Sequence, residues 1–380
     1  MKAELFSPRR MLQSMALSTA VSVAVAVLSA TAAIVPADAF AATAKSSHPA
    51  AKKKVAASSA KKSVKTADAA ADAPRAKATR KRVTLAANAR GHHAAVRKVA
   101  FQPRQPSAGQ AFGLHDTPDA LALRSSVAYV VDQNSNEPLF DKNSHAVVPI
   151  ASITKLMTSM VALDSKLPLG DQIEVTDEDR DYEKGTGSRL SVGSVLSRED
   201  MLHIALMASE NRAAAALSRY YPGGRPAFIA AMNAKAKALG MNDTHFENST
   251  GLSSQNVSSA RDLVKMVDAA YQYPLIRKFS TDRSYEVNTG KRTLAYNSTN
   301  ALVRNSNSTW DIGLQKTGFI NEAGECLVMQ ATIHGRAMVM VLLDSYGKYS
   351  RFADAVRLRN WLDNGGGDRL TAANSPNGGT

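Results

Sequence analysis

Three short stretches organise this sequence: Ser152-Ile153-Thr154-Lys155, Ser209-Glu210-Asn211 and Lys316-Thr317-Gly318. They follow the patterns S-x-x-K, S-x-N and K-T-G, in that order along the chain. Each pattern is short enough to occur by chance. The three in this order predict one site, at which an acyl group is transferred to a serine.

The sequence around S-x-x-K predicts a helix from Ile150 to Asp164. Apolar residues recur there at intervals of three and four, as on one face of a helix. Ser152 and Lys155 are three residues apart, so their side chains can meet on that helix.

The other two motifs fall at the ends of predicted elements. Ser209-Glu210-Asn211 separates a predicted helix, Arg198 to Ala208, from another, Ala213 to Tyr220. A plain Ser/Asn helix cap is the alternative interpretation of this triplet. Lys316-Thr317-Gly318 ends a predicted strand that begins at Asp311.

Acyl transfer needs a nucleophile and a base, and the first two motifs offer both. Ser152 can be the nucleophile. Lys155 can be its base if burial and the neighbouring cation Lys316 lower its pKa. Ser209 can carry a proton to the leaving nitrogen, and Asn211 can hold Lys155 and a substrate amide.

The third motif offers substrate contacts. Lys316 and Thr317 can bind a terminal carboxylate. Gly318 has no side chain, so an extended substrate can lie against this strand. The backbone N–H groups of Ser152 and Phe319 can form an oxyanion hole.

Charge divides the chain of 380 residues, whose net charge is +14. Residues 41–110 hold sixteen Lys or Arg and two Asp, so the excess positive charge lies in that segment. We expect 42–112 to be a disordered basic linker, since it has few large apolar residues. It can attract anionic wall polymer or lipid head groups weakly. The remainder has no basic excess, which excludes nucleic acid as an expected partner.

The two ends of the chain predict export and a tail. Residues 1–41 combine a basic start, an apolar run and small-x-small cleavage sites, so we expect a signal peptide, with an uncleaved membrane anchor as the alternative. Both place the folded part, predicted at 113–364, outside the cytoplasmic membrane, in the periplasm. Residues 365–380 are predicted to be a disordered tail.

The remaining cysteine, histidine and acidic residues do not indicate a second catalytic site or a metal site. Cys326, the one cysteine, lies in an apolar run and is expected to be buried and inert. The eight histidines lack the spacing of metal ligands, so we predict no metal and no cofactor. The acidic run Asp177 to Asp181 is expected to be solvated.

Longer stretches around the motifs resemble the low-molecular-mass penicillin-binding proteins, the serine D-alanyl-D-alanine peptidases. The resemblance covers about residues 115–362 and is carried by the following stretches: Pro149 to Thr158, Met207 to Ala214, Phe246 to Leu252 and Lys316 to Gly324. It implies an α/β (α+β) fold: a five-stranded antiparallel sheet flanked by helices, with a mostly helical subdomain. It also implies that Ser152 forms the acyl-enzyme, that Lys155 accepts its proton, and that Ser209 and Lys316 complete the site.

The same resemblance implies peptidoglycan stem peptides as substrates and β-lactams as inhibitors. Only about 18 residues follow Leu362, which leaves no room for the C-terminal β-domain of many carboxypeptidases and favours the endopeptidase branch. Arg212 departs from the acidic residue that many carboxypeptidases have at this position, without a clear meaning.

Two alternatives stay open. A β-lactamase of the same fold needs a residue that activates water for deacylation, and Glu247 is a candidate, although its surroundings lack the usual Glu-x-x-Leu-Asn form. A non-catalytic wall-binding protein is the other, against which the intact Ser152, Lys155, Ser209 and Lys316 speak.

Overall fold

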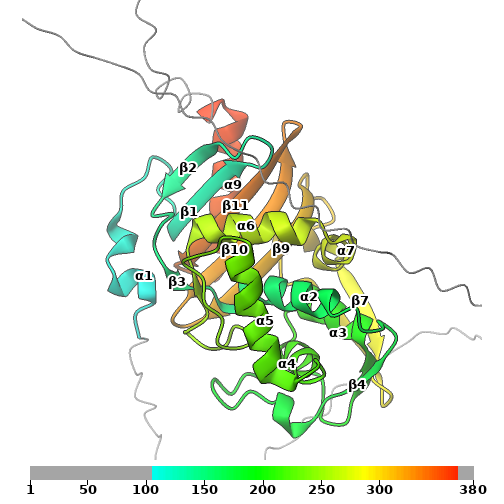
Figure 1. The fold of residues 1–380 in the computed structure, drawn as a ribbon. Coiled ribbons are helices and arrows are strands. Elements are labelled where there is room, and N and C mark those ends of the chain that lie inside the picture. The colour runs from blue at the N-terminus through cyan, green and yellow to red at the C-terminus, as the bar shows by residue number, and fades with distance from the viewer. Residues whose placement is uncertain (1–104, 367–380) are drawn as a thin grey trace, which may run out of the picture. The chain divides into compact units, whose positions relative to one another are not determined.

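The computed structural model describes residues 105–366 (Figure 1). The predicted signal (1–41), the linker up to residue 104 and the tail from residue 367 lie outside the described residues. Within the described range, none of the helices combines the length and the apolar character needed to cross a membrane.

A five-stranded sheet forms the centre of the fold, with the spatial order β2-β1-β11-β10-β9. Every neighbouring pair is antiparallel, so the predicted sheet is confirmed. β9, which carries the K-T-G motif, is an edge strand. The strands are β1 (Ser125–Asp132), β2 (Pro138–Lys142), β9 (Asp311–Ile320), β10 (Gly324–Ile333) and β11 (Arg336–Ser345).

Alternate residues of the strands enter two separate cores, because successive side chains point to opposite faces of a sheet. On β1, Val127 and Val131 join the core beneath α6 (Ala260–Tyr271), while Ala128 and Val130 join the core beneath α9 (Ser350–Asp363). The sheet is therefore covered by helices on both faces (Figure 1).

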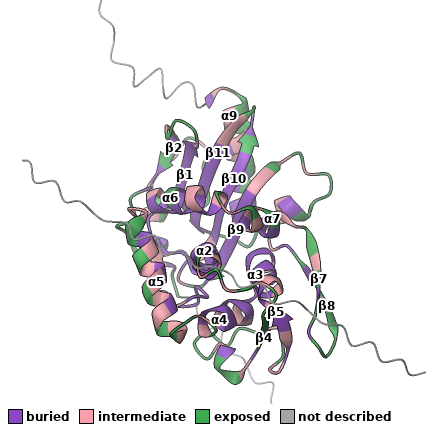
Figure 2. Cartoon of the chain, turned by 45° about the vertical axis from the view of Figure 1, so that its right-hand side comes forward, coloured by how far each residue is buried: buried purple, intermediate pink, exposed green. Residues whose placement is uncertain are grey.

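A mostly helical region lies between the first and third motifs, as predicted. Its middle is α2, whose first eight residues, Lys155 to Ala162, are all buried (Figure 2). A helix that is enclosed on every side holds its side chains in fixed positions, which suits a catalytic base. The helices are α2 (Lys155–Asp164), α3 (Arg198–Met207), α4 (Asn211–Arg219), α5 (Gly224–Ala238) and α7 (Pro274–Thr281).

Short elements complete the described chain. Three two-stranded sheets pair β3 with β6, β4 with β5, and β7 with β8. Their bounds are β3 (Val148–Pro149), β4 (Gln172–Glu174), β5 (Val195–Ser197), β6 (Val257–Ser258), β7 (Ser284–Asn288) and β8 (Thr293–Asn297). The short helices are α1 (Ala108–Ala111) and α8 (Ala301–Arg304), and the 3₁₀ turns are η1 (Leu114–Asp116), η2 (Ala151–Thr154) and η3 (Asp177–Asp179).

Three details differ from the sequence predictions. The helix predicted from Ile150 begins as the 3₁₀ turn η2, so Ser152 stands just before α2. The acidic run is not wholly solvated, because Asp179 is buried and accepts hydrogen bonds from Arg219 and Arg225. Residues 105–112, predicted as the end of a disordered linker, contain α1, and the buried Ser107 beside it donates a 2.9 Å hydrogen bond to the Asp344 carboxylate.

Candidate active site

The three motifs meet where η2, the α3–α4 junction and β9 come together. Two glycines permit this close approach. A β-carbon at Gly318 would lie 2.9 Å from the Ile150 carbonyl oxygen and 3.0 Å from the Ser152 nitrogen. A β-carbon at Gly251, whose φ is +79°, would lie 2.0 Å from the Ala151 carbonyl oxygen. Backbone from three parts of the chain therefore packs around Ser152 without intervening side chains.

Lys155 is fully buried and its ammonium nitrogen, Nζ, has three oxygen neighbours. It lies 2.8 Å from Ser152 Oγ, 2.7 Å from Asn211 Oδ1 and 2.7 Å from the Thr250 carbonyl oxygen. The last two oxygens can only accept hydrogen bonds. A neutral Lys155 donates its two protons to them and therefore directs its lone pair at the Ser152 hydroxyl, which is the arrangement a general base needs.

Burial also prepares Lys155 for this task. Removal from water lowers the pKa of Lys155 from 10.5 to about 7, and the Glu210 carboxylate partly opposes this effect. A base with a pKa near neutrality is populated in its neutral form at working pH. Burial lowers the pKa of Lys155, as predicted. The charged neighbour that acts on this pKa is the anion Glu210, whereas the cation Lys316 was predicted.

Ser209 and Lys316 form the second half of the site. Lys316 Nζ donates to Ser209 Oγ over 2.9 Å and to the Thr317 carbonyl over 2.8 Å. Burial lowers the pKa of Lys316 well below its ordinary value, and the nearby cations Lys155 and Arg351 lower it further. A substrate carboxylate placed beside Lys316 would oppose this effect and favour its charged form.

Two residues of the site have strained backbone conformations. Ser209 has a φ of +59° and Ala151, directly before Ser152, has a φ of +47°. Residues other than glycine seldom adopt such angles, and they persist where the surrounding structure enforces them, often at functional sites.

Several contributors were not predicted from the sequence. The Thr250 carbonyl binds Lys155, and Glu210 accepts hydrogen bonds from Ser188 Oγ at 2.6 Å and from the Arg212 backbone. Thr299 shares a 2.6 Å hydrogen bond with Thr317. Arg351, at the start of α9, pairs with Glu325 on β10 beside these cations. Among these contributors, Glu210 is the one that the sequence could have indicated, because it lies inside the S-x-N motif.

Other candidate residues lie apart from this chemistry. Glu247 is exposed and forms an ion pair with His245, so its carboxylate does not contact Ser152 or Lys155. Arg212 donates to the Leu190 carbonyl and supports a loop. Cys326 is buried, and burial raises the pKa of its thiol to about 12.

Within residues 105–366, no group of His, Cys, Asp or Glu side chains is arranged to hold a metal ion.

Comparisons with known proteins agree with this geometry. Residues 115–347 match the model of the D-alanyl-D-alanine carboxypeptidase family of peptidases, and the chain belongs to this family. It is therefore a serine peptidase of the penicillin-binding class, and the family and fold predicted from the sequence are confirmed.

Two similar relatives are named D-alanyl-D-alanine endopeptidases. The chain is 51% identical over 253 residues to a D-alanyl-D-alanine endopeptidase of Pseudomonas aeruginosa, covering 66% of this chain and 81% of the relative. It is 50% identical over 245 residues to one of Escherichia coli, covering 64% and 78%. The crystal structure of the Streptomyces K15 DD-transpeptidase is similar, with a TM-score of 0.59, 28% identity, and coverage of 64% and 98%.

Proposed function

We propose that this protein hydrolyses D-alanyl-containing peptide bonds of peptidoglycan, and that it acts mainly as an endopeptidase on 4→3 cross-links. The observation that carries the proposal is the contact between Ser152 Oγ and the buried Lys155 Nζ at 2.8 Å. The endopeptidase branch is supported by relatives with that name at 51% and 50% identity, whereas a carboxypeptidase of Bacillus subtilis is 29% identical.

The first step forms the acyl-enzyme. Neutral Lys155 takes the proton of the Ser152 hydroxyl, and the oxygen attacks the carbonyl carbon of the D-Ala residue. Backbone N–H groups of Ser152 and Phe319 would stabilise the oxyanion. Their assignment is supported by the close approach of the strand, because a β-carbon added to Gly318 would lie 3.0 Å from the Ser152 nitrogen.

The second step releases the leaving group. The carbon–nitrogen bond breaks, and Ser209, which is hydrogen-bonded to Lys316, passes its proton to the departing nitrogen. The proton that Lys155 took from Ser152 replaces the Ser209 proton, so Lys155 becomes neutral again. Asn211 positions Lys155, and its amide can also bind the acyl part of the substrate. Lys316 and Thr317 would hold a carboxylate of the leaving group, whose negative charge would favour the charged form of the buried Lys316. Water then attacks the ester, with Lys155 again as base.

β-Lactams should acylate Ser152 by the same steps. A water-activating glutamate of the β-lactamase type would have to lie near the ester, but Glu247 faces solvent beside His245. We therefore propose inhibition by penicillin, with slow loss of the adduct.

The place of action is proposed from the substrate and from the sequence of the first segment. We propose export to the periplasm by residues 1–41, a basic linker that begins at residue 42, and a peptidase domain over 113–364, against which α1 (Ala108–Ala111) packs. This rests on the basic start and apolar run of the first segment. Attraction of the linker to anionic polymer stays a prediction.

Purified muropeptides test the proposed activity. Cross-linked dimers and pentapeptide monomers are incubated separately with the protein, and the products are separated by chromatography. Loss of dimers with monomers left intact supports an endopeptidase. Trimming of monomers alone identifies a carboxypeptidase, and activity on neither substrate contradicts the proposal.

A further inference from the structure

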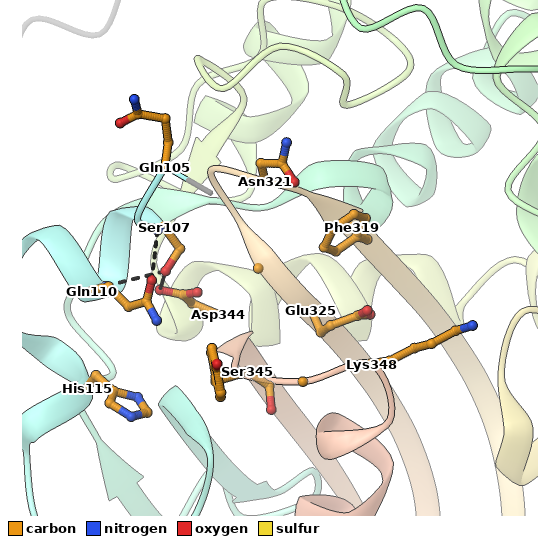
Figure 3. A pocket seen from close by; sticks show the side chains of 13 residues that line it. Gln105, Ser107, Gln110, His115, Phe319, Asn321, Glu325, Asp344, Ser345 and Lys348 are labelled. Carbon is orange, nitrogen blue, oxygen red and sulfur yellow. Dashed lines mark hydrogen bonds between the residues drawn. The ribbon is translucent and has the colours of Figure 1, made fainter. Parts of the chain in front are cut away.

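A cavity of about 530 Å³ opens directly beyond the K-T-G motif. Phe319, the residue after Gly318, forms one of its walls, and Asn321 lies at the turn between β9 and β10 (Figure 3). Tyr346 and Lys348 on the loop before α9 form another wall, opposite α1. The mechanism above uses none of these side chains. It uses only the backbone N–H group of Phe319.

Buried contacts hold the residues around the cavity in place. Asp344, which is 4% exposed, accepts a 2.9 Å hydrogen bond from Ser107 Oγ beside α1. β-Carbons at Gly109 and Gly324 would lie 1.9 and 2.3 Å from its carboxylate oxygens, so only glycine fits at both places. The backbone of Ala108 also donates to the Glu322 carbonyl at the β9–β10 turn, over 2.9 Å. α1 is thereby fixed against the end of the sheet.

The direction of the substrate on β9 decides which part of it reaches this cavity. The leaving nitrogen must meet Ser209, and Ser209 is bonded to Lys316. The acyl part therefore runs the other way along the strand, from Gly318 towards Phe319 and Asn321. A strand advances about 3.3 Å per residue, so the cavity begins within a few residues of the scissile bond, on the acyl side.

The walls favour an anionic peptide with apolar parts. The two acidic side chains in the cavity are already engaged, since Glu325 pairs with Arg351 and Asp344 binds Ser107. Lys348 is exposed, and its Nζ lies 5.5 Å from the centre of the Tyr349 ring. Phe319 and Tyr346, with exposed fractions of 45% and 59%, present aromatic surface.

We propose that this cavity binds the stem peptide of the acyl-donor strand, on the N-terminal side of the residue that acylates Ser152. Lys348 pairs with a carboxylate of that peptide, and Phe319 and Tyr346 contact its apolar parts. The inference rests on the proposed function, because it extends the same substrate beyond the catalytic centre. It assigns to α1 and the β11–α9 loop a role in selecting long donor peptides over short ones.

The test compares two substrates in one set of variants. Lys348→Ala and Tyr346→Ala, alone and combined, are assayed for kcat/KM on two 4→3 cross-linked muropeptide dimers, one with a complete donor stem peptide and one whose donor stem is cut back to the last residues before the scissile bond. Lys237→Ala, at an exposed position on α5, is the matched control. We expect the double variant to lose about tenfold or more in kcat/KM on the complete dimer, the size of a lost charged hydrogen bond, and little on the shortened dimer.

The rate of penicillin acylation distinguishes a failure of the cavity assignment from a failure of the proposed function. It should be the same in all variants, because penicillin does not reach the cavity. Equal losses on both substrates, or no loss on either, would overturn the cavity assignment while leaving the proposed function intact. A wild-type protein that acylates with penicillin but cleaves neither dimer would instead refute the proposed function, and the subsite with it.

A second readout does not need turnover. A stem tripeptide that lacks both D-Ala residues should inhibit hydrolysis of the complete dimer by the wild type. Inhibition should weaken about tenfold in the Lys348→Ala variant if the carboxylate contact is formed. Unchanged inhibition in that variant would exclude Lys348 from binding the donor peptide.

Discussion

Lys155 Nζ lies 2.8 Å from Ser152 Oγ and, at the same time, within hydrogen-bond distance of two oxygens that can only accept. Activation of the Ser152 hydroxyl therefore depends on the protonation state of Lys155. Only the neutral amine can take the Ser152 proton, and burial supplies the pKa that makes this form available.

The pH dependence of acylation should follow Lys155. Because its pKa is lowered to about 7, the rate of penicillin acylation should rise with pH through about 7 and then level off. Stopped-flow measurement of the acylation rate across pH checks this. A rate that rises only near the ordinary lysine pKa of 10.5 would contradict the proposed base.

Glu210→Gln should move this pH profile to lower pH. The Glu210 carboxylate raises the pKa of Lys155, so its neutralisation leaves the burial effect less opposed. The amide keeps the shape of the side chain and can still accept from Ser188. The acid limb of the acylation profile is the measurement, and a shift towards higher pH would show that the charge of Glu210 does not act on Lys155 as we describe.

Gly318→Ala should impair acylation more than stability. The added methyl group would lie 3.0 Å from the Ser152 nitrogen and 2.9 Å from the Ile150 carbonyl oxygen, so β9 must move away from the nucleophile. A displacement of about 1 Å can cost about a hundredfold in rate. Gly170→Ala is the control, because its added methyl group meets nothing within 4 Å. Equal acylation rates in both variants would refute the close approach.

The Glu325–Arg351 pair should contribute to stability. Their side chains are only 13% and 10% exposed, and Glu325→Ala would leave a buried guanidinium without its partner. Breaking such a pair costs about 3 kcal/mol. Asp177→Ala, which breaks the exposed pair with Arg180, should change the free energy of unfolding by less than about 1 kcal/mol. Urea denaturation measures both, and similar small losses would contradict the burial argument.

Cys326 should be inert and dispensable for acylation. It is fully buried, and its thiol pKa is raised to about 12, so almost no thiolate forms at neutral pH. Iodoacetamide should label Cys326 only after unfolding, and Cys326→Ala should retain the wild-type rate of penicillin acylation. Labelling of the native protein would show that the strand opens more readily than its packing indicates.

The sequence predicted those parts of the site whose spacing is local or whose motif is specific. Ser152 and Lys155 are three residues apart, and helical geometry alone brings them together. Lys316 and Ser209 are far apart in sequence, and only the order of the motifs predicted their contact. The Thr250 carbonyl was not predicted, because a backbone oxygen leaves no trace in the residue type.

The fold was predicted to a similar extent. Long strands such as β10 and β11 have clear apolar patterns, whereas the three-residue strands β4 and β5 are too short to show one. Asp179 was expected in solvent because its neighbours are acidic. The residues that bury it, Arg219 and Arg225, lie in a later part of the chain and could not be paired with it from sequence.

Mass spectrometry of the protein after reaction with penicillin tests the central claim most directly. We expect the intact mass to increase by one penicilloyl group, the modified peptide to contain Ser152 as the acylated residue, and the adduct to persist for minutes. The Ser152→Ala variant should show no increase. A penicilloyl group on another residue, or equal labelling of Ser152→Ala, would contradict the assignment of Ser152 as the nucleophile.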